Sequence, residues 1–159
     1  MQARLRRRLG ATLTASAALI ALTGCEQPTP IVTLYSGGTS LYDDAFSYCF
    51  DGQDPAKEPG TAGACRFDAD RQTKKLGVRP GDVVVVDVDR DIAEKGWYVV
   101  LRGAEANQQV RLATQQEHVT SFQPDFTQSP TITVLVQKLT DTSDTAQSIG
   151  VWQFELFPE

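Results

Sequence analysis

Histidine and cysteine, which carry much of catalysis and metal binding, are scarce in this sequence. Its 159 residues contain one histidine, three cysteines and one methionine, the initiator. A serine or cysteine hydrolase needs a histidine beside its nucleophile, and a copper site of the cupredoxin kind needs two histidines and a cysteine. The only histidine, His118, stands between Glu117 and Val119, an ordinary polar context. We therefore predict that the protein is not an enzyme and holds no cofactor.

Motifs for phosphate binding, thiol redox chemistry and zinc catalysis are also absent from the sequence. The segment Gly38-Thr39-Ser40-Leu41-Tyr42 comes nearest to a nucleophile elbow, but it lacks the final glycine. Asp43 and Asp44 are adjacent, and adjacent side chains of a strand point to opposite faces. Two carboxylates so placed cannot share a proton or a substrate oxygen, so we assign this pair no role.

Asp87, Asp89 and Asp91 form one acidic pattern that resembles a metal site. They begin like a calcium-binding loop, but position 6 is Ile92 in place of glycine and position 12 is Tyr98 in place of glutamate. Strand alternation would put the three carboxylates on one side, so they form a weak calcium candidate. The alternative, which we favour, is a solvated strand face without a metal.

A run of about 20 apolar residues, which a membrane-spanning helix needs, does not occur in the sequence. An uncharged, mostly apolar stretch, 11–22, follows four arginines and has the length typical of a signal peptide. It leads into Leu22-Thr23-Gly24-Cys25, which matches the lipobox cleaved by lipoprotein signal peptidases. We expect residues 1–24 to be removed and Cys25 to receive the lipid. This places the protein on the extracytoplasmic side of the cell membrane.

The arginines only partly resemble a twin-arginine signal, so we favour export in the unfolded state.

Positive charge is also scarce once the signal peptide is removed. The mature chain keeps 11 basic against 20 acidic residues, a net charge of −9. Such a surface repels nucleic acid and anionic lipid headgroups, so we predict no nucleic-acid partner and leave a basic protein partner open. The 135 mature residues suit one domain. We assign residues 25–30 to a lipidated tether and residues 31–159 to a single β domain, with no prediction of oligomeric state.

Lipidation of Cys25 would leave Cys49 and Cys65 as a pair in an oxidising compartment. We therefore predict a disulfide between them. The 15 intervening residues are rich in glycine, proline and charge, and closing a loop of that length stabilises the fold by about 3 kcal/mol. A metal or redox pair is the alternative, but the spacing is not Cys-x-x-Cys and no histidine is near.

Short β-rich runs separated by turn signals fill the rest of the chain. The expected extended runs are 31–35, 40–50, 83–89, 96–102, 109–113, 118–122, 131–139 and 152–156. The strongest turn signals are Ser36-Gly37-Gly38-Thr39 and Arg79-Pro80-Gly81-Asp82, and residues 90–95 could form a single helical turn. Such a pattern predicts an all-β fold. We expect an antiparallel immunoglobulin-like sandwich, with a barrel as the alternative.

Several of these features occur in an order that resembles a known family. They are the lipobox, a first strand ending in Ser36-Gly37-Gly38, Tyr48-Cys49, the second cysteine, the Arg-Pro-Gly-Asp turn, Trp97 and the closing Gly150-Val151-Trp152. The chain is similar to actinobacterial envelope lipoproteins whose domain has no assigned function. The resemblance implies the compartment, the disulfide and the β fold, and it transfers no catalytic residue.

Two non-enzymatic functions fit the sequence. The first, which we favour, is a binding or accessory module that contacts another envelope protein through exposed aromatic residues such as Tyr35, Tyr42 or Phe126. The alternative is a carrier or sensor of a small apolar ligand or lipid held between the sheets. The side chains that would line such a site are Trp97, Trp152, Phe154 and Val134.

Overall fold

The computed structural model describes residues 27–103, 109–114, 117–143 and 145–159. The strands in these ranges are β1 (Val32–Ser36), β2 (Thr39–Asp43), β3 (Ser47–Tyr48), β4 (Arg66–Phe67), β5 (Lys74–Val78), β6 (Val84–Val88), β7 (Trp97–Arg102), β8 (Gln109–Thr114), β9 (Val119–Phe122), β10 (Ile132–Leu139) and β11 (Ser148–Pro158). One helical turn, α1 (Arg90–Ala93), lies between β6 and β7 at the place predicted for it.

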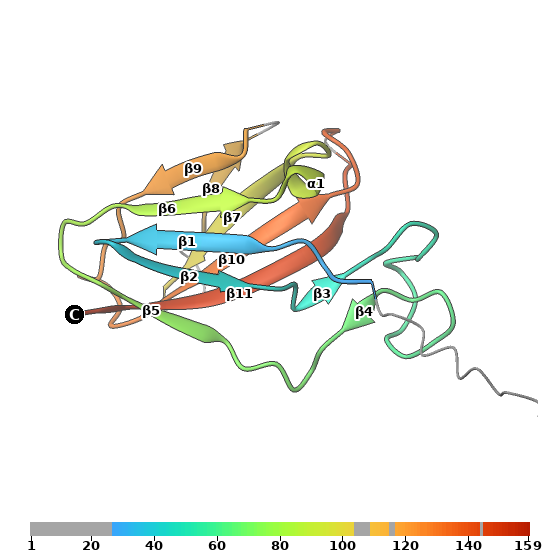
Figure 1. The fold of residues 1–159 in the computed structure, drawn as a ribbon, viewed down its shortest axis with the longest axis horizontal. Helices are drawn as coiled ribbons and strands as arrows, with labels where there is room; N and C mark the ends of the chain where they lie inside the picture. Colours follow the sequence, from blue (N-terminus) through green and yellow to red (C-terminus); the bar gives the residue numbers. More distant parts are fainter. Residues whose placement is uncertain (1–26, 104–108, 115–116, 144) are drawn as a thin grey trace, which may run out of the picture.

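The strands form two sheets that pack face to face (Figure 1). Sheet A has the order β2-β1-β6-β9, and sheet B has the order β4-β3-β11-β10-β7-β8. β5 also belongs to sheet B, where it pairs in parallel with the last part of β11, while the other strand pairs are antiparallel. The fold is therefore a sandwich that is not closed into a barrel, which confirms the first prediction and not the alternative.

Alternation along the central strands produces the core between the sheets. In β6, Val84, Val86 and Val88 point inward and are buried, while the side chains between them are only half-buried. The same period of two buries Trp152, Phe154 and Leu156 in β11, and Ile132, Val134 and Val136 in β10. β6 lies between β1 and β9, as its apolar first residues predicted.

Both predicted turns are present. β1 and β2 form a hairpin in which Ser36 faces Thr39, and Gly37 and Gly38 have φ angles of 55° and 84°. Two successive residues with positive φ are what a two-residue turn of this kind requires, which explains the glycine pair. In the second turn, the Asp82 amide donates to the Arg79 carbonyl over 3.0 Å.

Three segments differ from the prediction. The run 40–50 is not one strand, because β2 ends at Asp43 and β3 begins only at Ser47. β4 and β5 were not predicted. In β5 only Leu76 and Val78 are buried, and its partner β11 is 80 residues away in sequence, so local pattern gave little signal for it.

The predicted disulfide between Cys49 and Cys65 is confirmed. It closes the loop between β3 and β4 at one end of the sandwich (Figure 1). Inside this loop the Asp54 amide donates to the Gly63 carbonyl over 2.8 Å, so the two arms of the loop are also joined by the backbone.

Candidate functional site

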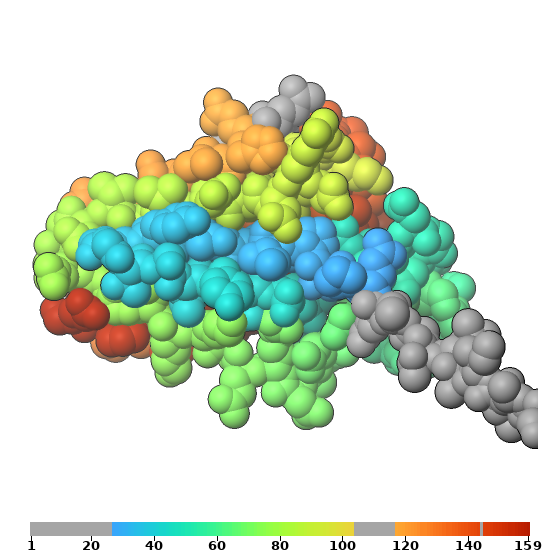
Figure 2. All heavy atoms as spheres, viewed as in Figure 1, coloured from blue at the N-terminus to red at the C-terminus, as the bar shows by residue number. Residues whose placement is uncertain are grey.

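The outer surface of sheet A carries exposed apolar side chains. Tyr35 on β1 is 42% exposed, Tyr42 on β2 62%, Val83 before β6 49% and Val119 on β9 47%. Residues that pair across neighbouring strands point to the same side of the sheet. Tyr35 pairs with Val85. Thr33, two residues before Tyr35, pairs with Tyr42 on one side and Asp87 on the other, and Asp87 pairs with Val119. We call Tyr35, Tyr42, Val83, Val85 and Val119 the sheet A face. Its strands lie in front in the space-filling view (Figure 2).

A shallow pocket of about 380 Å³ opens beside the hairpin turn on this face. Tyr35, Val83 and Val85 supply its apolar side chains, and Gly37 and Gly38 supply backbone. Since the glycines carry no side chain, a partner group could approach the turn backbone closely. An exposed aromatic residue beside a concave surface is typical of the anchor positions in protein interfaces.

Tyr42 is held in place by a lysine of sheet B. The Lys74 ammonium lies 5.0 Å from the centre of the Tyr42 ring and donates to the Tyr42 carbonyl over 2.7 Å. A cation over an aromatic face contributes about 0.5–1 kcal/mol at an exposed site. One side of the ring is thus fixed by Lys74, while most of its surface still faces solvent.

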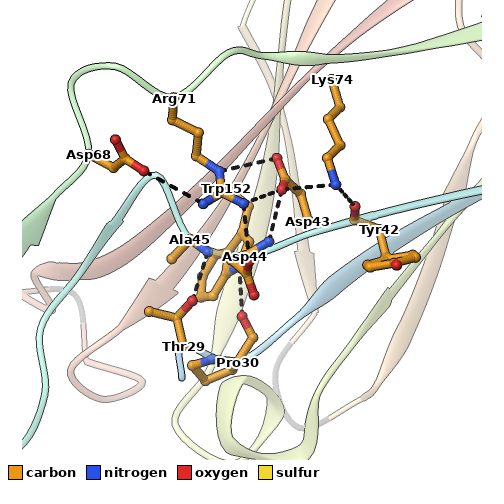
Figure 3. Close-up of polar contacts among 10 residues, drawn as sticks. All are labelled: Thr29, Pro30, Tyr42, Asp43, Asp44, Ala45, Asp68, Arg71, Lys74 and Trp152. Atoms are coloured by element: carbon orange, nitrogen blue, oxygen red, sulfur yellow. Dashed lines mark hydrogen bonds and ion pairs between the residues drawn. The ribbon is translucent and has the colours of Figure 1, made fainter. Parts of the chain in front are cut away.

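A network of ion pairs fixes this edge of sheet A to the segment that precedes β5 (Figure 3). Asp43, only 3% exposed, accepts from the Arg71 guanidinium and lies 3.3 Å from the Lys74 ammonium. The same guanidinium donates to Asp44 over 3.3 Å. The hydrogen bond with Asp43 is the main cause that raises the pKa of Arg71, so the guanidinium stays charged. The sequence indicated no role for Asp43, and its role is to join these two segments.

A second polar feature lies between the sheets, where Lys138 continues the inward face of β10 after Val134 and Val136. Its side chain is 4% exposed, and its ammonium donates to the Tyr48 hydroxyl over 2.7 Å. Burial lowers the pKa of Lys138, and burial followed by the charge of Asp91 raises the pKa of Tyr48. This pair was not predicted from the sequence, although alternation from Val134 places Lys138 inside.

The calcium candidate does not have the predicted geometry. β6 ends at Val88 and α1 begins at Arg90, so strand alternation does not continue to Asp91. Asp89 instead accepts the Ile31 amide over 2.6 Å and joins the start of β1 to the end of β6. In the described part of the chain no three histidine, cysteine or acidic side chains are grouped so that they could hold a metal ion.

The other candidate residues have ordinary positions in the fold. His118 is exposed and its Nδ1 lies 3.3 Å from the Val88 carbonyl. The four side chains proposed to line an apolar ligand site are at most 1% exposed and pack in the common core: Trp97, Trp152, Phe154 and Val134. Phe126 was expected to be exposed, and that is wrong, because it is half-buried and packs against the same core.

The end of the predicted tether is bound to the sandwich. The Thr29 hydroxyl accepts the Ala45 amide over 3.1 Å, and the Pro30 carbonyl accepts the Trp152 indole N–H over 3.0 Å (Figure 3). The lipobox Leu22-Thr23-Gly24-Cys25 and the rest of the predicted signal peptide lie outside the described residues. Within the described ranges, no helix has the length and apolar character to cross a membrane.

Fold and surface together define a disulfide-bonded β-sandwich with one apolar outer face and a buried lysine at its end. No protein-family model, curated protein or solved structure matches the sequence.

Proposed function

We propose that the protein is a lipid-anchored, extracytoplasmic binding or accessory module of the cell envelope, without enzymatic activity. In this proposal the sheet A face docks another envelope protein. The observation that carries it is the shared outward orientation of Tyr35 and Tyr42, each more than 40% exposed on adjacent strands. Aromatic side chains of this kind supply large contact area at low conformational cost.

Charge indicates the chemistry of the partner. The mature chain carries a net charge of −9, and Asp87 lies on the outer side of β6 in the cross-strand row that also contains Tyr42 and Val119. A partner that fits this surface has an apolar centre and basic residues at the edge. Such binding weakens as ionic strength rises, because screening reduces the attraction between the opposite charges.

The anchor is proposed from the sequence alone. A lipobox directly after a signal-peptide pattern supports diacylglycerol on Cys25. Each buried methylene of the acyl chains contributes about 0.8 kcal/mol, so two or three chains hold a small domain on the membrane without a spanning segment. Since Thr29 is already packed in the sandwich, few residues would separate the lipid from the domain.

Capture of the partner from native membranes tests the proposal. The lipidated protein is crosslinked in its own membrane, and captured proteins are identified by mass spectrometry for three forms: wild type, the double variant Tyr35→Ser with Tyr42→Ser, and Phe157→Ser. Phe157 is 37% exposed and lies on β11 of sheet B, so its variant controls for loss of an exposed aromatic residue. We expect one partner with wild type and Phe157→Ser that the double variant does not retain. Equal capture by all three forms would contradict docking on the sheet A face.

A further inference from the structure

The end of the sandwich near Tyr48 contains a cavity of about 240 Å³ that the proposed function does not use. We call it the Lys138 pocket. Its walls come from β3, β10, the disulfide loop and the segment around α1, and its polar side chains include Tyr48, Asp51, Asp91, Glu94, Lys95 and Lys138. A neighbouring cavity of about 360 Å³ shares Tyr48 and Asp91 with it. Together they reach the size of sites for small molecules, roughly 300–1,000 Å³.

The inner part of the pocket is rich in hydrogen-bond donors. Lys138 is 4% exposed, and within the described residues its ammonium has no carboxylate within 4 Å. The ammonium donates instead to the neutral hydroxyl of Tyr48, which accepts from it and therefore keeps its own proton to donate. A buried cation without a counter-ion is costly. An anionic group that enters the pocket would be bonded by both side chains and would remove that cost.

The outer part has the opposite charge. Asp51 and Asp91 are exposed and line the same pocket, and we call them the rim carboxylates. Glu94 and Lys95 also line it, and the carboxylate of Glu94 is already paired with Arg90 over 2.6 Å. The charges of the rim carboxylates act on the buried pair, since Asp91 and Asp51 both raise the pKa values of Lys138 and Tyr48. A simple anion would be repelled by this rim. A ligand with a positive group next to its negative group would be attracted by the rim and by the interior alike.

We propose that the Lys138 pocket binds a small zwitterion, whose anionic group is bonded by Lys138 and Tyr48 and whose ammonium group lies among the rim carboxylates. The ligand class is a phosphate or carboxylate joined to an amine through a short linker. A soluble metabolite or the headgroup of a zwitterionic phospholipid could supply it. This site is separate from the sheet A face, so it stands or fails independently of the partner proposal.

Calorimetric titration of the lipidated protein in non-ionic detergent tests the site. The probes are phosphoethanolamine, inorganic phosphate and ethanolamine, which carry both charges, the anion alone and the cation alone. We expect saturable one-to-one binding of phosphoethanolamine that is at least tenfold tighter than binding of either single-charge probe. Absence of saturable binding, or equal affinity for inorganic phosphate, would overturn the proposal.

Three variants place the binding in the pocket. Lys138→Met removes the buried ammonium and should weaken phosphoethanolamine binding at least tenfold, and Asp91→Asn, at an exposed position, should weaken it several-fold without affecting folding. Lys75→Met is the matched control, because Lys75 is 60% exposed and pairs with Glu155 away from the pocket. Unchanged affinity in both pocket variants would overturn the assignment.

Vesicles then distinguish the two sources. Phosphatidylcholine vesicles with and without phosphatidylethanolamine are added to the complex of the Cys25→Ala form with phosphoethanolamine. Displacement by vesicles of either composition assigns the ligand to a zwitterionic lipid headgroup, which both phospholipids carry. Retention of the soluble probe with both vesicles assigns it to a soluble zwitterion.

Discussion

The guanidinium of Arg71 donates to both carboxylate oxygens of Asp43, 28 residues earlier in the chain. Asp43 ends β2 in sheet A, and Arg71 lies in the segment that leads into β5 of sheet B. The bond therefore fixes the loop after β4 to the edge strand that carries Tyr42. Because the carboxylate is buried, its loss affects both the stability of the fold and the position of the sheet A face.

Asp43→Ala should destabilise the protein by about 2–4 kcal/mol, because it leaves the Arg71 guanidinium without its buried counter-ion. Asp44→Ala is the matched control, since Asp44 is 56% exposed and its pair with Arg71 is worth at most about 1 kcal/mol. Denaturant unfolding of both variants measures the difference. Similar losses of unfolding free energy in the two variants would show that the buried Asp43–Arg71 pair stabilises the fold no more than the exposed one.

Gly150→Ala should destabilise the protein by about 1–3 kcal/mol through overpacking. A Cβ atom at Gly150 would lie 2.9 Å from the Trp152 ring and 3.0 Å from the Tyr48 ring, and both rings are buried. At Gly103 the nearest atom to such a Cβ is 3.6 Å away, so Gly103→Ala is the control and should change the melting temperature little. A Gly150→Ala variant as stable as wild type would mean that the two rings can move apart.

Replacement of both Cys49 and Cys65 by serine should lower the free energy of unfolding by about 3 kcal/mol, the value expected for a loop of this length. Addition of a reductant to the wild-type protein should have the same effect and none on the double variant. Thermal unfolding with and without reductant checks both statements. If the reductant also destabilised the double variant, its effect on the wild-type protein could not be assigned to the Cys49–Cys65 disulfide.

The stability of the protein should depend on pH through Lys138. Burial lowers the pKa of Lys138 in the folded state, so the unfolded chain binds more protons between the two pKa values, and stability rises with pH through that window. Lys138→Met removes this titration. We expect the unfolding free energy of wild type, relative to Lys138→Met, to increase as pH rises toward the unfolded lysine value near 10.

The difference in unfolding free energy between wild type and Lys138→Met reports on Lys138, because the other titratable groups that face it are present in both proteins. They are Tyr48, Asp51, Asp91, Glu94 and Lys95. The raised pKa of Tyr48 acts in the opposite direction, since its contribution to stability is lost above its unfolded value near 10. Denaturation curves therefore stop below that pH. A constant or decreasing difference between the two proteins would contradict the lowered Lys138 pKa.

Alternation made much of the fold predictable from sequence. The valines of β6 and the Trp152-Phe154-Leu156 series each show one buried face, and the Gly37-Gly38 pair determines the hairpin turn. β5 was missed because its stability comes from pairing with the distant β11 and from ion pairs at its start. Such long-range partners leave no periodic signal in a single sequence.

The sites were less predictable than the fold. Tyr35 and Tyr42 are exposed as expected and lie on strands, whereas Phe126 lies in a loop, where no periodicity tells which side faces the core. Asp43 and Asp44 were expected on opposite faces of a strand, and that is wrong, because β2 ends at Asp43 and both carboxylates bond the Arg71 guanidinium, which is 28 residues from Asp43 in the chain. Lys138 stands inside an otherwise apolar face, and only the combination with Tyr48 and the rim carboxylates indicates a pocket.

Site-specific photocrosslinking measures most directly whether the sheet A face is the docking surface. A photoreactive residue replaces Tyr42 in the lipidated protein, and a second form carries it at Gln137, which points outward on sheet B. After irradiation of native membranes, the account predicts one crosslinked envelope protein at position 42, reduced by high salt, and none at position 137. Crosslinks at position 137 alone, or equal crosslinking at both positions, would contradict it.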